Sequence, residues 1–222
     1  MAGSWTMPDR DRGSVQEGDD MTRWMWIVGG PNGAGKTSFT REFLEILGHN
    51  NLVKLNADDR TQMLLPKCPG KSLPEVNLMA AQQIDAEVAA CIRSGASFLV
   101  ETVLSSDKYR DDVLEARSSG FRIGLVYISL FPRELSPARV SVRVRKGGHD
   151  VDPQKAIKRH QSSHEQAVWF ARRSDTFIAY DNSGRDGSPV LVAVKQGGEP
   201  LIHTNAGINP LLDAVIMTID HQ

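Results

Sequence analysis

The sequence has only two cysteines, Cys68 and Cys91, and they lie 23 residues apart with no second pair. A structural zinc site takes four ligands, so this pair does not form one, and reduced thiols are expected for both. No apolar run approaches the roughly 20 residues that a membrane-spanning helix needs. The N-terminal stretch MAGSWTMPDRDRGSVQEGDD lacks the apolar core of a signal peptide. We therefore expect a cytoplasmic protein with no membrane partner.

The sequence also has almost no net charge, because 26 Lys and Arg residues oppose 27 Asp and Glu residues in a chain of 222, for a formal charge of −1. Proteins whose main partner is nucleic acid carry a strong positive field, so this balance argues against nucleic acid, although it is compatible with a local basic patch. We expect residues 1–22, which are rich in charge, Gly and Ser, to be a disordered leader or an upstream extension. Residues 23–222 have a suitable length for one domain with a substantial core.

One complete motif is present: residues 30–37 read GPNGAGKT, which matches the phosphate-binding pattern G-x-x-x-x-G-K-[ST]. Its glycines let successive backbone N–H groups point at phosphate oxygens. Lys36 places a positive charge between the β- and γ-phosphates, and the Thr37 hydroxyl is a ligand for Mg²⁺. An apolar run (24–28) precedes the motif and a helical pattern (37–47) follows it, as the motif requires. The sequence therefore predicts a nucleoside triphosphate site formed by Gly30, Pro31, Asn32, Gly33, Ala34, Gly35, Lys36, Thr37 and Ser38.

Strand-like apolar runs alternate with helical patterns along the rest of the chain. Strands are expected at 24–28, 51–56, 97–101, 121–130 and 176–180, with a hairpin at 189–204. Helices are expected at 37–47, 73–95, 106–120, 134–148, 153–174 and 209–219. This alternation predicts an α/β fold, a three-layer αβα P-loop kinase sandwich with a mainly parallel central sheet. Ligands bind at the carboxyl ends of such strands, so the polar clusters 56–59, 101–102 and 181–183 should face the phosphate loop.

The other motifs of nucleotide-hydrolysing proteins are missing. A GTPase would carry a guanine-reading N-K-x-D element, and a motor-type ATPase would carry an apolar run ending in D-E, but neither is convincing here. Kinases of small metabolites instead place an acidic base after the second strand and close an Arg-rich lid over the phosphates. The order of elements here is that of such a kinase, with the lid around 134–174.

Two acids, Asp58 and Asp59, follow the second expected strand. A kinase needs an ionised carboxylate close to the γ-phosphate to accept the proton of the attacking hydroxyl. Adjacent acids that leave a strand point in different directions, so only one of them is expected to face the site. The alternative is that both cap the next helix.

Glu101 ends a buried strand with a charge, which is unfavourable unless a partner or ligand receives it. Three roles fit this position: binding the acceptor, holding Mg²⁺ through water, or forming a structural salt bridge.

The densest basic cluster contains Arg139, Arg143 and Arg145, together with Lys146. Arg139 and Arg143 are four residues apart and share a helix face, whereas Arg145 lies on another side. Negative charge spreads over the γ-phosphate oxygens during transfer, and positioned arginines there are worth roughly 10³–10⁵ in rate. The alternative is a solvated face; a nucleic-acid surface would show interleaved aromatics, which this cluster lacks. His160 and His164 have the spacing of a metal face, but without a third ligand we expect them to be surface residues of a helix.

The order of these motifs resembles that of the zeta-toxin-like P-loop kinases of bacteria. The resemblance covers about residues 24–204 and is carried by GPNGAGKT at 30–37, NAD at 56–58, SFLVET at 97–102, RVSVRVRKGGHDVD at 139–152 and YDNSG at 180–184. Founding members of that family are ATP-dependent kinases that phosphorylate the sugar of UDP-N-acetylglucosamine, and a small helical antitoxin holds them in check. The resemblance therefore implies ATP and Mg²⁺ as cofactors, a nucleotide sugar as acceptor and an antitoxin as partner.

Residue by residue, the resemblance implies that Lys36 and Thr37 hold ATP and Mg²⁺. It favours Asp58 over Asp59 as the catalytic base. The remaining implied roles are acceptor-side binding by Glu101, Thr102 and Arg143, and lid arginines on the phosphates at Arg139 and Arg145.

Two features depart from the family pattern. Val103 stands where related chains carry a second Thr or another small polar residue, and the segment 65–73 is shorter than the substrate-reading insertions of the founding toxins. The identity of the acceptor is therefore less supported than kinase chemistry. A regulatory ATP-binding protein or ATPase, and a polynucleotide or tRNA kinase, are the alternative functions.

Overall fold

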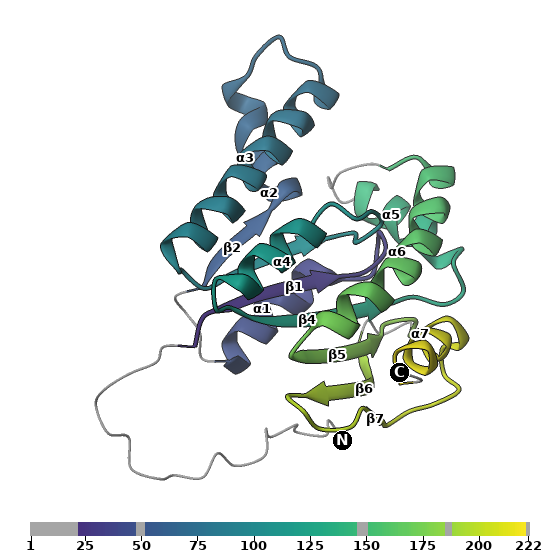
Figure 1. Ribbon diagram of the computed structural model, residues 1–222. Coiled ribbons are helices and arrows are strands. Elements are labelled where there is room, and N and C mark those ends of the chain that lie inside the picture. Colours follow the sequence, from purple (N-terminus) through teal and green to yellow (C-terminus); the bar gives the residue numbers. More distant parts are fainter. Residues whose placement is uncertain (1–21, 48–51, 146–150, 185–187, 221–222) are drawn as a thin grey trace.

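The computed structural model describes residues 22–47, 52–145, 151–184 and 188–220 (Figure 1). Within these residues, seven strands form a single sheet in the order β2-β3-β1-β4-β5-β6-β7. Strands β1 to β5 pair in parallel, whereas β6 and β7 are antiparallel to their neighbours. The strands are β1 (Trp24–Gly29), β2 (Val53–Asn56), β3 (Phe98–Thr102), β4 (Arg122–Ser129), β5 (Thr176–Asp181), β6 (Val190–Gln196) and β7 (Ile202–His203). The predicted mainly parallel sheet is confirmed.

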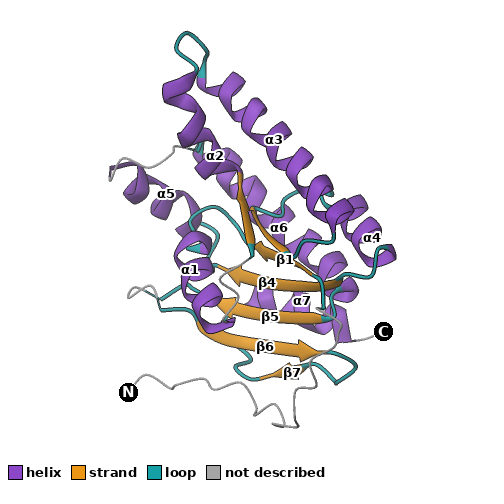
Figure 2. Ribbon diagram, turned by 90° about the vertical axis from the view of Figure 1, so that its left-hand side faces the viewer, coloured by secondary structure: helices purple, strands orange, loops and turns teal. Residues whose placement is uncertain are grey.

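Helices cover both faces of the sheet, which confirms the three-layer αβα arrangement (Figure 2). On one face α3, α4, α6 and α7 share a core with strand residues such as Met25, Phe98 and Tyr127. On the other face α1 packs through Phe43 against Trp26. The helices are α1 (Lys36–Leu47), α2 (Ala57–Leu64), the 3₁₀ turn η1 (Leu65–Lys67), α3 (Leu73–Ser94), α4 (Arg110–Ser118), α5 (Leu135–Arg145), α6 (Pro153–Arg173) and α7 (Pro210–Asp220). None of the helices in the described segments is long and apolar enough to cross a membrane.

The topology places the phosphate loop at the centre of the molecule. β1 lies between β3 and β4, so the chain leaves β1 first to one side of the sheet and later crosses to the other. In such sheets a crevice opens at the carboxyl ends of the strands where the direction of winding changes. The central strands are buried on both faces, which explains why β1, β3 and β4 are nearly continuous apolar runs instead of alternating ones.

Two helices differ from the sequence prediction. The polar cluster after β2 begins a helix of its own, α2, because Asn56 caps it by accepting from the backbone N–H of Asp58 at 2.8 Å. α2 then packs antiparallel to α3 as an arm that rises beside β2, joined by a bidentate Arg60–Glu87 pair (Figure 1). α4 begins at Arg110, later than the expected start at 106.

Other boundaries agree with the prediction or lie outside the described residues. α3 ends as expected at Gly95, whose φ of 72° is a left-handed conformation that glycine adopts without strain. Residues 1–21 of the expected leader and residues 146–150, which include Lys146 and the GGHD stretch, lie outside the part of the chain that the structure describes.

The expectation that His160 and His164 are surface residues is wrong. They are only 1% and 6% exposed, because this side of α6 packs against the end of β4. The Nε2–H group of His160 donates to the Leu130 carbonyl at 2.7 Å, and Nε2 of His164 lies 2.7 Å from the Ser129 hydroxyl. Sequence spacing showed that the two histidines share a helix face but did not show that this face is the buried one.

Candidate active site

The phosphate loop crosses the carboxyl end of β1 in a conformation that requires glycine at its turns. Gly30 has a φ of 150°, and a Cβ atom there would lie 2.1 Å from the carbonyl oxygen of Ile128. Gly35 has a φ of 85°, and a Cβ atom there would lie 2.8 Å from the amide nitrogen of Asn182. No side chain fits either place without moving the neighbouring backbone or a buried amide, so the glycines of the motif are sterically required.

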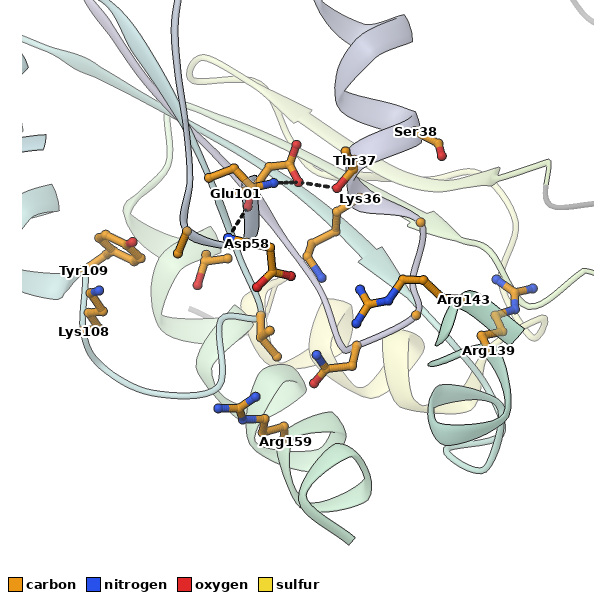
Figure 3. A pocket seen from close by; sticks show the side chains of 17 residues that line it. Lys36, Thr37, Ser38, Asp58, Glu101, Lys108, Tyr109, Arg139, Arg143 and Arg159 are labelled. Atoms are coloured by element: carbon orange, nitrogen blue, oxygen red, sulfur yellow. Dashed lines mark hydrogen bonds between the residues drawn. The ribbon is translucent and has the colours of Figure 1, made fainter. Parts of the chain in front are cut away.

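A cavity of about 410 Å³ lies against this loop (Figure 3). Its walls come from the phosphate loop and α1, from the carboxyl ends of β2 and β3, and from α5 and α6. The lining residues are Asn32, Gly33, Gly35, Lys36, Thr37, Ser38, Asn56, Ala57, Asp58, Glu101, Thr102, Val103, Lys108, Tyr109, Arg139, Arg143 and Arg159. Of the predicted nucleotide-binding residues, Gly30, Pro31 and Ala34 shape the loop from behind and do not line the cavity.

Lys36 faces the cavity from the start of α1. Its ammonium group donates to the carbonyl oxygens of Gly30 at 2.9 Å and Pro31 at 3.0 Å, so the loop itself holds the side chain. Burial lowers the pKa of Lys36 to about 8, opposed by the negative charges of Glu101 and Asp58 and reinforced by the positive charge of Arg143. The Lys36 ammonium is therefore weakly solvated, and an anionic ligand would stabilise its charged form.

Glu101 is held at the base of the cavity by three neighbours on α1 and β2. Its side chain is 3% exposed, and its Oε2 atom accepts from the Thr37 hydroxyl and from the Asn56 amide, both at 2.9 Å. Lys54 lies 3.3 Å from the other carboxylate oxygen. The sheet register causes this arrangement, since Asn56 on β2 lies directly opposite Glu101 on β3. Glu101 thus adjoins the Thr37 hydroxyl of the phosphate loop, which is the metal side of the predicted site.

The two adjacent acids after β2 point in different directions, as the sequence suggested. Asp58 lines the cavity, and its carboxylate lies on the same side as Lys36 (Figure 3). Asp59 instead pairs with Lys54 at 3.5 Å. Neither acid caps α2, because that role belongs to Asn56. Of the two acids, Asp58 and not Asp59 therefore shares the cavity with Lys36.

α5 sits directly over the phosphate loop. The Ser136 hydroxyl, which is fully buried, donates to the Asn32 carbonyl at 2.7 Å, and the Cβ atom of Arg139 packs against Gly33. Gly33 leaves room for this contact, because a Cβ atom there would lie 3.0 Å from that of Arg139. The helix is thereby fixed with one face toward the cavity.

This packing places two arginines of α5 in the cavity wall and leaves the third in solvent. Arg139 and Arg143 both line the cavity, and Figure 3 shows the Arg143 guanidinium turned toward Lys36 while that of Arg139 turns away. Arg139 donates from Nη2 to the Gly184 carbonyl at 2.7 Å. Arg145 is exposed and does not line the cavity, because two residues correspond to about 200° around a helix. Its role as a lid arginine stays a prediction that this geometry does not support.

The sequence did not single out three further residues of the cavity wall. Arg159 reaches the cavity from α6, and its position beside the buried His160 places it at the edge of the packed face. Lys108 and Tyr109 precede α4, and Lys108 pairs with Asp85 of α3 at 2.7 Å. A charged or aromatic residue in a loop after a strand is common, so only the fold could identify these three.

Thr102 and Val103 form the wall after β3. Thr102 lines the cavity while its hydroxyl accepts from the Leu104 backbone N–H at 3.1 Å. Leu104 has a φ of 55° and is 1% exposed, packed against the end of β1. Ser163 of α6 donates to the Val103 carbonyl at 2.7 Å. This strained turn is held from both sides, so the residues on either side of it have defined positions.

Comparison with known proteins identifies the family. A family model described as zeta toxin matches residues 13–195. No curated protein matches the sequence. A chain of the AvrRxo1-ORF1:AvrRxo1-ORF2 complex, solved with sulphate ions, is similar in structure with a TM-score of 0.67 and 19% identity over 88% of this chain and 64% of that chain. A structure of the same complex with ATP gives the same values. The chain thus spans less than two thirds of these relatives.

Two further solved structures share the fold. A chain of the PezAT chromosomal toxin–antitoxin system of Streptococcus pneumoniae has a TM-score of 0.57 and 19% identity over 78% of this chain and 72% of that chain. A chain of the Pnkp1/Rnl/Hen1 RNA repair complex has a TM-score of 0.53 and 18% identity over 87% of this chain and 56% of that chain.

Proposed function

The chain belongs to the zeta toxin family, and from that premise we propose that it is an ATP-dependent kinase acting on a hydroxyl of a small molecule. The observation that carries the proposal is the shared cavity in which Lys36 of the phosphate loop and the carboxylate of Asp58 stand together. One group would hold the phosphoryl donor and the other would accept the proton of the hydroxyl that attacks it. A regulatory nucleotide-binding protein has no need of the second group.

The donor end of the cavity suits ATP with Mg²⁺. Thr37 and Glu101 would hold the ion, the first directly and the second through water, and the ion would neutralise charge on the phosphates. The hydrogen bond that already joins these two side chains supports this assignment. Lys36 would exchange its bonds to Gly30 and Pro31 for phosphate oxygens, and the gain in opposite charge would raise its lowered pKa.

The transfer itself depends on fixed cations around the γ-phosphate. Arg143 is placed for this task, since its guanidinium turns toward Lys36, and Arg159 supplies a second cation from α6. Charge on the phosphoryl oxygens builds during transfer, so cations that need not move stabilise the transition state more than the ground state. Asp58, which lines the same cavity as Lys36, would take the proton as the acceptor oxygen attacks.

The acceptor we propose is a nucleotide sugar, with UDP-N-acetylglucosamine first. The family supports this choice, and the cavity wall opposite the phosphate loop offers hydrogen-bonding and stacking groups in Thr102, Lys108 and Tyr109. Val103 in the same wall is an apolar departure from the family pattern, so a related nucleotide sugar is the second candidate. By the same analogy we propose a small helical antitoxin as partner, because one structural neighbour belongs to a toxin–antitoxin system.

The test is a transfer assay with γ-labelled ATP and a panel of acceptors. The panel contains UDP-sugars, their parent sugars and nucleotides, and 5′-hydroxyl oligonucleotides of RNA and DNA, each with wild-type protein and with Asp58→Asn. We expect label on a nucleotide sugar with wild-type protein and none with the variant. Label on the oligonucleotides alone would favour the polynucleotide kinase alternative, which shares the fold. Release of phosphate without any labelled acceptor would favour the regulatory ATPase.

A further inference from the structure

A buried hydrogen-bond network joins the start of α7 to the chain that follows β5. Its centre is Asn209, which is 0% exposed. The side-chain amide nitrogen of Asn209 donates to Asp181 Oδ1 at 2.6 Å and to the Ser129 hydroxyl oxygen at 2.9 Å. The amide oxygen accepts from the Leu212 backbone N–H at 3.1 Å and so caps the first turn of α7. One side chain therefore both begins the last described helix and binds the ends of β4 and β5.

Asp181 uses the same carboxylate to shape the turn after β5. Its two oxygens accept from the Ser183 hydroxyl at 2.6 Å and from the Ser183 backbone N–H at 3.1 Å. The Ser183 hydroxyl in turn accepts from the Phe131 backbone N–H at 2.8 Å. With Asn209, three donors from the described residues reach Asp181, which is 6% exposed. A buried carboxylate depends on such donors, so the turn and the network stabilise each other.

This turn, residues 181–184, touches the nucleotide site on two sides. Asn182, which is 5% exposed, donates from Nδ2 to the Ala34 carbonyl of the phosphate loop at 2.9 Å. Gly184 accepts from Arg139 of α5 at 2.7 Å. The turn thus links the phosphate loop to the helix that covers it, although only the Arg139 side of this link lines the cavity itself.

The direction of each hydrogen bond requires a donor at Asn209. Burial lowers the pKa of His164 to about 4, so the ring is neutral. Its Nδ1 lies 2.8 Å from the His160 carbonyl and must carry the proton, which leaves Nε2 to accept from the Ser129 hydroxyl at 2.7 Å. Ser129 has then used its proton and can only accept from Asn209. An amide N–H at this place satisfies both Ser129 and Asp181, whereas a carboxylate would satisfy neither.

We propose that Asn209 is a positioning residue of the nucleotide site, which acts through Asp181 to hold the 181–184 turn against Ala34 and Arg139. The inference rests on the nucleotide-binding part of the proposed function. Asn209 lies outside residues 13–195 that the family model matches, so membership of the family does not assign this role. α7 is then part of the machinery that orders the phosphate loop, and not only a cover for the sheet.

The variant Asn209→Asp removes the donor to Asp181 but keeps the cap of α7. An Asp at this place can still accept from the Leu212 N–H, but it sets a carboxylate against Asp181 in place of a donor. We expect the Kd for Mg-ATP to rise about tenfold, the effect of losing one hydrogen bond to a charged group, with kcat within about twofold.

The control for a general loss of α7 packing is Ile219→Ala. Ile219 is buried on the same helix but makes none of these hydrogen bonds, so its loss should lower the melting temperature and leave the Kd unchanged. If Asn209→Asp does not fold, Ser183→Ala removes a different donor from Asp181 and should raise the Kd in the same way.

The measurement is a titration with a fluorescent ATP analogue, with circular dichroism on the same samples. Wild-type affinity in folded Asn209→Asp or Ser183→Ala would overturn the inference. Because the readout is binding, it is independent of the acceptor. A wild-type protein that binds Mg-ATP but transfers no phosphoryl group would contradict the proposed kinase activity and leave this inference standing.

Discussion

At the scale of single residues, the site separates groups that are adjacent in sequence. Asp58 and Asp59 are neighbours, yet one faces the cavity and the other pairs with Lys54. Thr37 and Glu101 are 64 residues apart, yet they share a hydrogen bond. Sequence patterns could name each of these residues because strands of a parallel sheet end at one edge. Which acid of the pair turns inward depends on the first turn of α2, and no short pattern records that turn.

The first prediction concerns that pair. Asp58→Asn removes the proton acceptor and keeps the size of the side chain, so kcat should fall by about 10²–10⁴ while the Kd for Mg-ATP changes little. Asp59→Asn loses only an exposed ion pair with Lys54 and should stay within about threefold of wild type. Steady-state kinetics and nucleotide titration on both variants check this. If Asp59→Asn is the inactive one, the base has been assigned to the wrong acid.

The second prediction is a pH dependence of nucleotide binding. The pKa of Lys36 in the free protein is about 8, so the side chain is charged below that pH and increasingly neutral above it. Phosphates bind the charged form, so the Kd for Mg-ATP should be flat from pH 7 to about pH 8. Above pH 8 it should rise, approaching tenfold per unit, until the pKa of the bound state is reached. Lys36→Ala should bind more weakly and lose this slope; the same slope in both proteins would show that another group titrates.

At the scale of elements, the packing of α5 decides which of its arginines line the cavity. The sequence placed Arg139 and Arg143 on one face, and the contact of Ser136 with the phosphate loop shows that this face is the inner one. The family resemblance instead selects Arg139 and Arg145. The motif that carries the resemblance continues past Arg145, into residues 146–150 outside the described part of the chain.

The third prediction follows from that difference. Arg143→Ala should lower kcat by at least about 10², with a smaller change in the Kd for Mg-ATP, since a cation directed at the phosphates matters most as charge develops. Arg145→Ala, a matched change two residues along the same helix, should have kcat within about threefold of wild type. Steady-state kinetics on the two variants shows whether Arg143 or Arg145 acts on the phosphates. A large loss in Arg145→Ala would mean that α5 turns or moves when nucleotide binds.

The fourth prediction belongs to α6. His160 fills the contact between this helix and the end of β4 and donates to the Leu130 carbonyl. His160→Ala should therefore lower the free energy of unfolding by about 2–4 kcal/mol, from a cavity and an unpaired carbonyl. Urea denaturation measures this, and Gln161→Ala on the exposed side of the same helix is the control. A change below about 0.5 kcal/mol would contradict the packing described for α6.

At the scale of the whole molecule, sequence reasoning succeeded where one local pattern determines the outcome. The phosphate loop, the buried strands and the Gly95 stop of α3 each follow from residues within one window. It failed where distant elements meet: the burial of His160 depends on β4, the entry of Arg159 into the cavity depends on how α6 crosses the sheet, and the Asn209 network joins residues up to 80 positions apart. The geometry of the candidate site depends mainly on such contacts between distant elements. Loops and helix faces contribute to it only after the sheet has fixed their relative positions.

The last prediction concerns the melting temperature of the whole protein with and without Mg-ATP. A ligand that binds only the folded state stabilises it, by about 2.7 kcal/mol when its concentration is 100 times the Kd. For a chain of this size that corresponds to a rise of roughly 5–10 °C in Tm. Mg-ATP should produce such a rise in the wild-type protein, and Lys36→Ala should lose most of it because the β- and γ-phosphates are no longer neutralised. Differential scanning fluorimetry across ATP concentrations tests this, with AMP, which lacks the β- and γ-phosphates, as the control. An equal rise in both proteins would mean that ATP stabilises the chain somewhere other than the phosphate loop.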